Sequence, residues 1–382
     1  MTLTQAEQET LLGRPVRPLL TAADRGAFAG ERCLVTGAAG SIGAELARQL
    51  ASCDPAVLTL VDQNEERLFY LERELAERWP GVTLDPVLAD VTRPATMRLA
   101  FRRVRPRVVF HAAAYKHVTM AERAACAAAR VNVLGAASVL SAARIVGARV
   151  VLVSTDKAAS PSSVMGATKR LAELVTVGSG GPACRTAVVR FGNVLGSSGS
   201  FVAIAQDCIR RGIPIPVTDL HATRYFMTVS EAVALVLKAD SLARRGETFW
   251  LDMGNPVRIG DLVGRLIALA VDQGLRPVPV RVIGLRPGEK GAEQLTTQGL
   301  KMCATAHPRL WVARQAPVPA AAIGAAMRAL RQHVSRGDAI GVLRTLTAIV
   351  PEYEPSPDAL ATARADVLHV RQAGWMPQLR SA

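Results

Sequence analysis

Short apolar runs alternate with amphipathic segments through the first half of the chain. The runs near residues 31–37, 56–62, 82–88, 107–114 and 149–155 are apolar throughout, which is typical of strands buried on both faces. Segments with a helical period separate them, including a charged one, NEERLFYLERELAERW, and a long Ala-rich one. This alternation predicts a parallel sheet covered by helices on both faces. The expected fold class is therefore α/β, with a doubly wound parallel Rossmann sheet.

The pattern loosens after residue 191. Helical segments near 201–212, 230–245 and 257–274 lie among short strands and loops. We expect this smaller α/β part to sit over the carboxyl edge of the sheet and mainly to bind substrate. The expected division is an N-terminal arm at 1–29, a Rossmann domain at 30–191, the substrate-binding part at 192–316 and a helical tail at 317–382.

Composition narrows the function classes. The 382 residues are 49% hydrophobic and 20% charged, so the chain can bury a core. The net charge is +14, but 40 of the 46 cations are Arg, scattered and without the interleaved aromatics of a nucleic-acid groove. The six Cys form no CxxC, no signal peptide is visible, and no uncharged apolar run reaches the ~18 residues of a membrane span. We expect a reduced, cytoplasmic protein with no metal, no nucleic-acid partner and no transmembrane segment.

A glycine-rich turn predicts a dinucleotide site. Gly37, Gly40 and Gly43 follow the first strand and open a helix, whose N-terminus favours a pyrophosphate. Asp62 ends the next strand, about 20 residues on, where a carboxylate accepts ribose hydroxyls and repels a 2′-phosphate. This predicts NAD rather than NADP, although Arg67 stands one turn later. The expected cofactor-binding residues are Gly37, Ala39, Gly40, Ser41, Ile42, Gly43, Asp62, Gln63, Asp90, Val91, Ala112, Ala113, Ala114, Lys116 and Lys169.

The GxxGxxG spacing is that of the short-chain dehydrogenases. That family places a Tyr four residues before a Lys on one helix face. Here Lys169 is present, but Met165 stands at the Tyr position and cannot transfer a proton. Either catalysis has been lost or the proton transfer has moved to other residues.

Longer motifs carry a closer resemblance. STDKAASPSSVMGATKRLAE, RFGNVLGSSGSF, TRYFMTVSEAV and GLRPGEK resemble the bacterial UDP-N-acetylglucosamine 4,6-dehydratases of polysaccharide biosynthesis, which are extended short-chain dehydrogenases. The similarity is to their Met-containing, configuration-retaining branch and runs from about Leu11 to Glu354. Long members carry an N-terminal membrane region, and this chain resembles a free-standing version of their soluble part. Lys116, Lys157, Lys169 and Lys290 fall in or beside these motifs, in a chain that otherwise favours Arg.

The resemblance implies a three-step reaction on UDP-N-acetylglucosamine. NAD takes hydride from C4, water is eliminated across C5 and C6, and the hydride returns to C6, so a tightly bound cofactor is recycled. The elimination needs an acid and a base side by side. We expect Asp156, with a raised pKa, as the acid at C6 and Lys157, with a lowered pKa, as the base at C5. Either Thr155 and Lys169 relay the 4-hydroxyl proton through water, or Lys169 binds the ribose and lowers the local potential. Met165 is expected to pack or gate.

The same resemblance places the substrate contacts. Asn193 is expected at the diphosphate, Arg224 and Arg286 at phosphate charge, and Lys116 and His117 near the nicotinamide and sugar. The full expected set is Lys116, His117, Asn193, Ser200, Arg224, Arg286 and Glu289. The chain departs from the family pattern at 291–294 and 119–122, which puts the exact sugar in doubt more than the reaction class.

Alternatives remain open at this point. One is a UDP-sugar epimerase or a dehydratase that inverts C5, and another is a degenerate protein that only binds NAD or a nucleotide sugar. We also expect a homo-oligomer, with the Ala-rich helices as a dimer face.

Overall fold

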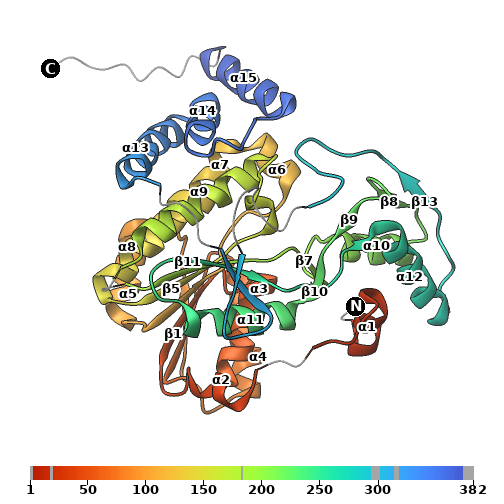
Figure 1. The fold of residues 1–382 in the computed structure, drawn as a ribbon, viewed down its shortest axis with the longest axis horizontal. Coiled ribbons are helices and arrows are strands. Elements are labelled where there is room, and N and C mark those ends of the chain that lie inside the picture. The colour runs from red at the N-terminus through yellow and green to blue at the C-terminus, as the bar shows by residue number, and fades with distance from the viewer. Residues whose placement is uncertain (1–2, 18–19, 182–183, 294–301, 314–317, 373–382) are drawn as a thin grey trace.

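The structure is a computed structural model, and it describes residues 3–17, 20–181, 184–293, 302–313 and 318–372. Its centre is a nine-stranded sheet in the order β14-β15-β11-β6-β5-β4-β1-β2-β3 (Figure 1). The strands are β1 (Arg32–Thr36), β2 (Val57–Asp62), β3 (Leu84–Leu88), β4 (Val108–His111), β5 (Arg149–Val153), β6 (Thr186–Arg190), β11 (Glu247–Leu251), β14 (Met302–Ala304) and β15 (Leu310–Ala313). All neighbouring strands from β3 to β11 are parallel. At the other edge, β15 runs antiparallel to β11, and β14 runs antiparallel to β15.

Helices cover both faces of this sheet. One face carries α3 (Ser41–Ala51), α4 (Glu65–Arg78) and α11 (Val229–Leu242), and its apolar residues form one core with β1, β4 and β6. The other face carries α5 (Pro94–Val104), α8 (Ala136–Val146) and α9 (Val164–Ser179). The expected doubly wound Rossmann class is therefore confirmed, since crossover helices leave the parallel strands buried on both sides.

The sheet continues past the boundary expected at residue 191. Strands β11, β14 and β15 belong to the main sheet although they lie within 192–313. The rest of that segment forms a smaller lobe from α10 (Phe201–Arg210), α12 (Ile259–Asp272) and three strand pairs (Figure 1). The pairs are β7 (Asn193–Leu195) with β10 (Phe226–Thr228), β9 (Thr223–Arg224) with β12 (Val257–Arg258), and β8 (Ile215–Val217) with β13 (Val280–Val282).

The N-terminal arm is part of the folded body. It contains α1 (Gln5–Leu12) and α2 (Ala22–Gly26), and α1 packs on α12. Leu11 is fully buried in the core of the smaller lobe. The Arg14 guanidinium donates to the buried Glu231 carboxylate at 2.9 and 3.2 Å. The arm thus joins the smaller lobe to the start of α11.

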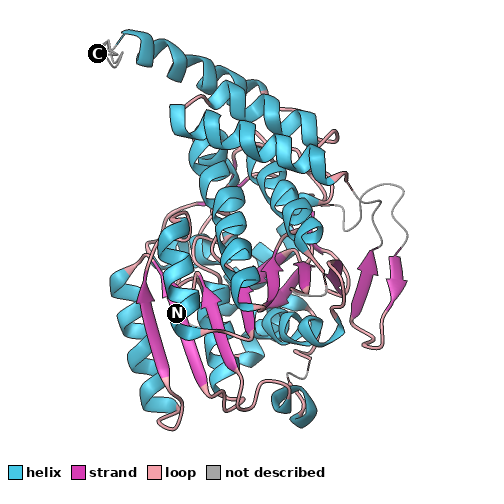
Figure 2. Cartoon of the chain, turned by 90° about the vertical axis from the view of Figure 1, so that its left-hand side faces the viewer, coloured by secondary structure: helices cyan, strands magenta, loops and turns pink. Residues whose placement is uncertain are grey.

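The C-terminal helices pack on the side of the Rossmann domain. They are α13 (Ala320–Arg336), α14 (Ala339–Ile349) and α15 (Pro357–Gln372), stacked above the sheet in Figure 2. They contact α6 (Val118–Arg123), α7 (Ala125–Ala129) and α9. Helices of the same chain therefore cover part of the Ala-rich stretch that we expected to form a dimer face, and the oligomeric state stays a prediction.

One helical stretch of the described residues, 125–146, is long and apolar enough to cross a membrane. It comprises α7, a π-helical turn η1 (Arg130–Gly135) and α8. Most of the stretch is buried between the sheet, α5, α9 and the C-terminal helices. Its apolar surface is thus accounted for by the core of the protein.

Candidate active site

The glycine-rich turn packs closely against the backbone after β4 and against the first turn of α3. Gly37 has a φ of 67°, and a Cβ there would lie 2.6 Å from the Ala113 nitrogen after β4. A Cβ on Gly43 would lie 2.0 Å from the Gly37 carbonyl oxygen. Gly40 precedes α3 without any side-chain cap, so first-turn N–H groups of α3, which begins with Ser41 and Ile42, stay available to an anion.

Acidic residues at two strand ends brace this turn. Asp62 accepts hydrogen bonds of 2.9 Å from the backbone N–H groups of Ala39 and Asn64. Gln63 beside it is exposed. Asp90 accepts from the Thr92 backbone N–H and hydroxyl, both at 2.8 Å. The two carboxylates therefore shape the edge where a ribose and an adenine would lie.

The segment after β4 and the π-helical turn η1 face the glycine-rich turn. Ala112, Ala113 and Ala114 follow β4, with Ala113 against Gly37. The buried Asn132 of η1 accepts from the Tyr115 N–H at 2.8 Å and donates to Thr168 Oγ1 at 3.0 Å. This network fixes the backbone that precedes Lys116. Val91 is buried against Gly135 of the same turn.

Asp156 and Lys157 form the centre of the site, just after β5. The Asp156 backbone is held by the Phe191 carbonyl at 3.0 Å, and its side chain is fully buried. Its Oδ1 accepts from Thr155 Oγ1 at 2.9 Å and from Lys157 Nζ at 3.1 Å. Its Oδ2 has no hydrogen-bond partner among the described residues. One carboxylate oxygen is thus buried without a partner.

The expected direction of the Lys157 pKa is wrong. Burial alone would lower this pKa, but the neighbouring carboxylates of Asp156 and Glu293 outweigh it and raise the pKa above its ordinary value. Lys157 Nζ lies 3.1 Å from Asp156 Oδ1 and 3.5 Å from Glu293 Oε1. The two carboxylates therefore favour the protonated form of Lys157.

Helix α9 supplies the buried lysine. Ser163 caps α9 through the Gly166 N–H, and Lys169 Nζ donates to the Val153 carbonyl at the end of β5 at 2.6 Å. Burial lowers the Lys169 pKa to about 8. Met165 is 3% exposed and packs in the apolar core. The position of the usual Tyr is thus filled by a core side chain.

A buried ion pair below the centre was missed from the sequence. Arg190 Nε donates to Glu173 Oε1 at 2.6 Å, and neither side chain is exposed. Glu173 also accepts from Ser154 Oγ at 2.6 Å, and Arg190 reaches the Ala158 carbonyl at 3.4 Å. The pair therefore braces both ends of the Thr155–Lys157 segment. The sequence signal was the charge within the apolar run TAVVRF, which a strand buried on both faces rarely contains.

The loop 196–200 connects the start of α3 with the segment that carries Lys116 and His117. Its Ser198 N–H donates to Ser41 Oγ at 3.0 Å, at the start of α3. A Cβ on Gly199 would lie 2.6 Å from His117 Cε1, and Lys116 Nζ reaches Ser197 Oγ at 3.4 Å. Ser200 caps α10 through the Ala203 N–H. Asn193 begins β7 at the entrance of this loop, half-buried.

Two of the expected phosphate ligands have other partners. Arg224 donates to the carbonyl oxygens of Thr223 and Gly291, each at 2.8 Å, and to that of Lys290. Arg286 is half-exposed and pairs with Glu289 of its own turn at 2.6 Å. In this structure Arg224 therefore holds the 286–293 loop, and Arg286 with Glu289 forms a surface ion pair.

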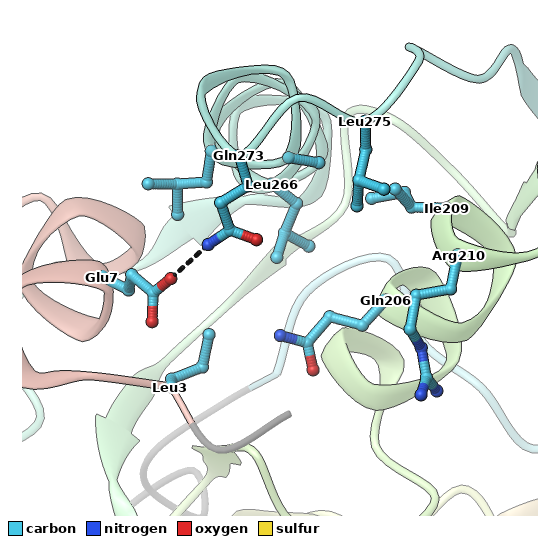
Figure 3. A pocket seen from close by; sticks show the side chains of 10 residues that line it. Leu3, Glu7, Gln206, Ile209, Arg210, Leu266, Gln273 and Leu275 are labelled. Carbon is cyan, nitrogen blue, oxygen red and sulfur yellow. Dashed lines mark hydrogen bonds between the residues drawn. The ribbon is translucent and has the colours of Figure 1, made fainter.

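No metal centre is visible within the described ranges, where no group of three or more His, Cys, Asp or Glu side chains gathers. A small pocket between α1, α10 and α12 lies in the smaller lobe (Figure 3). It is lined by apolar side chains and by Glu7 and Gln273, which share a 2.6 Å hydrogen bond. None of the candidate residues lines it.

Known proteins share this arrangement. The family model described as "Polysaccharide biosynthesis protein" matches residues 33–315. The capsular polysaccharide biosynthesis protein CapD of Staphylococcus aureus is 41% identical over 297 residues, covering 77% of this chain and 49% of CapD. The chain thus spans about half the length of that relative.

Two further comparisons bear on the site. A UDP-N-acetylglucosamine 4,6-dehydratase (inverting) of Campylobacter jejuni is 30% identical over 69% of this chain and 76% of its own length. The X-ray structure of Pen from Bacillus thuringiensis superposes with a TM-score of 0.70 at 29% identity, covering 75% of this chain and 88% of Pen. The chain is therefore similar in sequence to a UDP-N-acetylglucosamine 4,6-dehydratase and similar in fold to Pen.

Proposed function

Because the chain belongs to the family of polysaccharide biosynthesis proteins, we propose that it is an NAD-dependent nucleotide-sugar 4,6-dehydratase whose substrate is UDP-N-acetylglucosamine. The observation that carries this proposal is the Asp156–Lys157 pair, which places a carboxylate and an ammonium group 3.1 Å apart at the carboxyl end of β5. An elimination of water across two adjacent carbons uses a base for the C5 proton and an acid for the leaving oxygen, and this pair supplies both kinds of group side by side. A hydride exchange alone would not require it.

The residues of the glycine-rich turn fit NAD. The close approach at Gly37 and Gly43 leaves room for a pyrophosphate only because neither has a side chain. The uncapped start of α3 would receive its charge, and Asp62 would accept ribose hydroxyls. We propose that the cofactor stays bound, because hydride removed from C4 returns to C6 and no cofactor is consumed.

Proton transfer from the 4-hydroxyl group is assigned to Lys169. Met165 cannot accept a proton, and Lys169 is the buried base on the same helix, with a pKa of about 8. Thr155 ends the neighbouring strand segment and supplies a hydroxyl for a water-mediated relay. A plain 4-epimerase of this fold would use the missing Tyr, which favours the dehydratase over that alternative.

The test is a mass measurement. Purified protein is incubated with UDP-N-acetylglucosamine and no added cofactor, and loss of one water is sought in the sugar nucleotide. We expect water loss in the wild type and none in Asp156→Asn. Proton NMR of the product at C5 is expected to show retention of configuration. A bound dinucleotide with an unchanged sugar would contradict the proposal and favour a protein that only binds NAD or a nucleotide sugar.

A further inference from the structure

Lys157 lies between two carboxylates that come from distant parts of the chain. The distance from Lys157 Nζ to Asp156 Oδ1 is 3.1 Å. The distance from the same nitrogen to Glu293 Oε1, on a loop of the smaller lobe, is 3.5 Å. The side chains of Asp156 and Glu293 are 0% and 4% exposed, so solvent screens neither contact strongly. Glu293 has no role in the function proposed above.

The loop that carries Glu293 is held against the centre independently of that carboxylate. Arg224 donates to the carbonyl oxygens of Lys290 and Gly291, and the Thr223 N–H donates to Gly291 at 3.1 Å. Lys290 Nζ donates to the Ser160 carbonyl, beside the Asp156–Lys157 turn. An isosteric change at Glu293 therefore removes a charge without releasing the loop.

The charges that face Lys157 favour its protonated form. Asp156 and Glu293 raise its pKa, while Arg224, 3.8 Å from Glu293, lowers it. Lys290 is the other cation nearby, and burial lowers its own pKa, which weakens its repulsion of Lys157. Within the described residues Asp156 Oδ2 is buried and has no hydrogen-bond partner, so one acceptor of this group is unused.

We propose that Glu293 is a positioning residue that holds Lys157 as an ammonium ion, so that Lys157 donates the proton to the departing C6 oxygen and Asp156 accepts the proton from C5. This inference rests on the proposed dehydratase function. It reverses the roles expected from the sequence, in which Asp156 was the acid and Lys157 the base.

The proton and electron balance closes within the pair. Asp156 Oδ2 takes the C5 proton, and the electrons of the C5–H bond form the C5–C6 double bond. The C6–O bond breaks, its electrons stay on oxygen, and Lys157 Nζ gives that oxygen a proton, so water leaves. Asp156 and Lys157 remain hydrogen-bonded. When hydride returns to C6, the Asp156 carboxylic acid gives its proton back to C5. Lys157 regains a proton from solvent, and this proton balances the one lost from the 4-hydroxyl group.

The two assignments predict pH effects of opposite sign. If Lys157 is the acid, the single-turnover rate of water loss falls as pH rises through its pKa. Glu293→Gln should move this fall to lower pH by about 1 unit, because a neighbouring negative charge is lost. In Glu293→Asp, which keeps the charge, the pH at which the rate falls should lie between the values for the wild type and Glu293→Gln. A rate that rises with pH through this range, or a faster Glu293→Gln variant at neutral pH, would make Lys157 the base and overturn the proposal.

A second readout needs no turnover. Amine acetylation at a series of pH values, followed by peptide mass spectrometry, reports the pKa of Lys157 directly. We expect that pKa to fall in Glu293→Gln and to stay unchanged in Asp207→Asn, whose carboxylate forms ion pairs with Arg210 and Arg211 on the surface of α10. An unchanged Lys157 pKa in Glu293→Gln would refute the role of Glu293. If the wild type does not release water, the dehydratase proposal fails separately, since the labelling result stands on its own.

Discussion

Arg190 and Glu173 form an ion pair that is completely buried, 2.6 Å from Nε to Oε1, beneath the segment that carries Asp156 and Lys157. The Arg190 guanidinium also stacks on the Trp250 ring, 4.6 Å from its centroid. A pair buried in this way is costly to desolvate, so its value lies in what it fixes. Here it connects β6, α9 and the turn after β5.

We predict that Arg190→Met destabilises the protein strongly. The change leaves the Glu173 carboxylate buried without its main partner, which typically costs about 3–5 kcal/mol. The measurement is the midpoint of urea unfolding. Asp207→Asn, which breaks an exposed pair, is the control and should change stability by less than about 1 kcal/mol. Equal effects of the two changes would show that Arg190 has no special structural role.

Gly43→Ala should reduce the amount of dinucleotide that purifies with the protein. The added methyl would lie 2.0 Å from the Gly37 carbonyl, so the turn must shift away from the position that admits a pyrophosphate. Gly81→Ala is the matched control, because a Cβ at Gly81 meets nothing within 4 Å. Released dinucleotide is quantified after denaturation. Wild-type content in Gly43→Ala would contradict this placement of the cofactor.

The rate of C4 oxidation should rise with pH around pH 8. The Lys169 pKa is lowered to about 8, so its neutral, proton-accepting form grows as pH increases through this value. Lys169→Arg should reduce the rate at least about 100-fold, because Arg stays protonated and cannot act as a base. Transient absorbance of the reduced nicotinamide follows this step.

Lys238→Arg is the control for Lys169→Arg. Lys238, on α11, forms a 2.8 Å ion pair with Asp24, and an Arg can keep this pair. A pH-independent rate of C4 oxidation would exclude Lys169 as the base. A strong gain of activity in Met165→Tyr would show that the proton path still depends on the usual Tyr position.

Ser356→Ala should loosen the C-terminal helices where they meet α9. Ser356 Oγ donates to Glu122 Oε2 at 2.5 Å and accepts from the Ala359 N–H at 3.1 Å, while Glu122 Oε1 accepts from the Val164 N–H at 2.6 Å. Loss of a helix N-cap costs about 1 kcal/mol. Faster amide exchange is expected in the first turn of α15.

Ser335→Ala serves as the control for α15, because the Ser335 hydroxyl is exposed and bonds only its own helix at Gln332. If both variants exchange at the wild-type rate in α15, the contact between Ser356 and Glu122 does not secure this helix. The comparison requires no enzymatic activity.

Features encoded over a few residues were predictable from the sequence. The alternation of apolar runs and helical segments specified the parallel sheet, and the glycine spacing specified the turn between β1 and α3, because both depend on local geometry. The Asp156–Lys157 dipeptide and Lys169 were also identified, since residue type alone limits which groups transfer protons.

The partners of these groups depend on long-range packing and could not be predicted in the same way. Arg224 was expected at a phosphate, but the return of the 286–293 loop gives its guanidinium two carbonyl acceptors, Lys290 and Gly291, beside that of Thr223. The C-terminal helices cover part of the Ala-rich stretch that was expected to form a dimer face.

By itself, then, the sequence determined the fold class, the dinucleotide turn and the chemical groups of the site. The tertiary structure decided the directions of their pKa shifts. Burial lowers the pKa of Lys169, whereas Lys157, which is less buried, has the carboxylates of Asp156 and Glu293 as neighbours and a raised pKa. The physical reason is that a pKa reflects burial and the charges within a few ångströms, and both are set by segments that lie far apart in the chain.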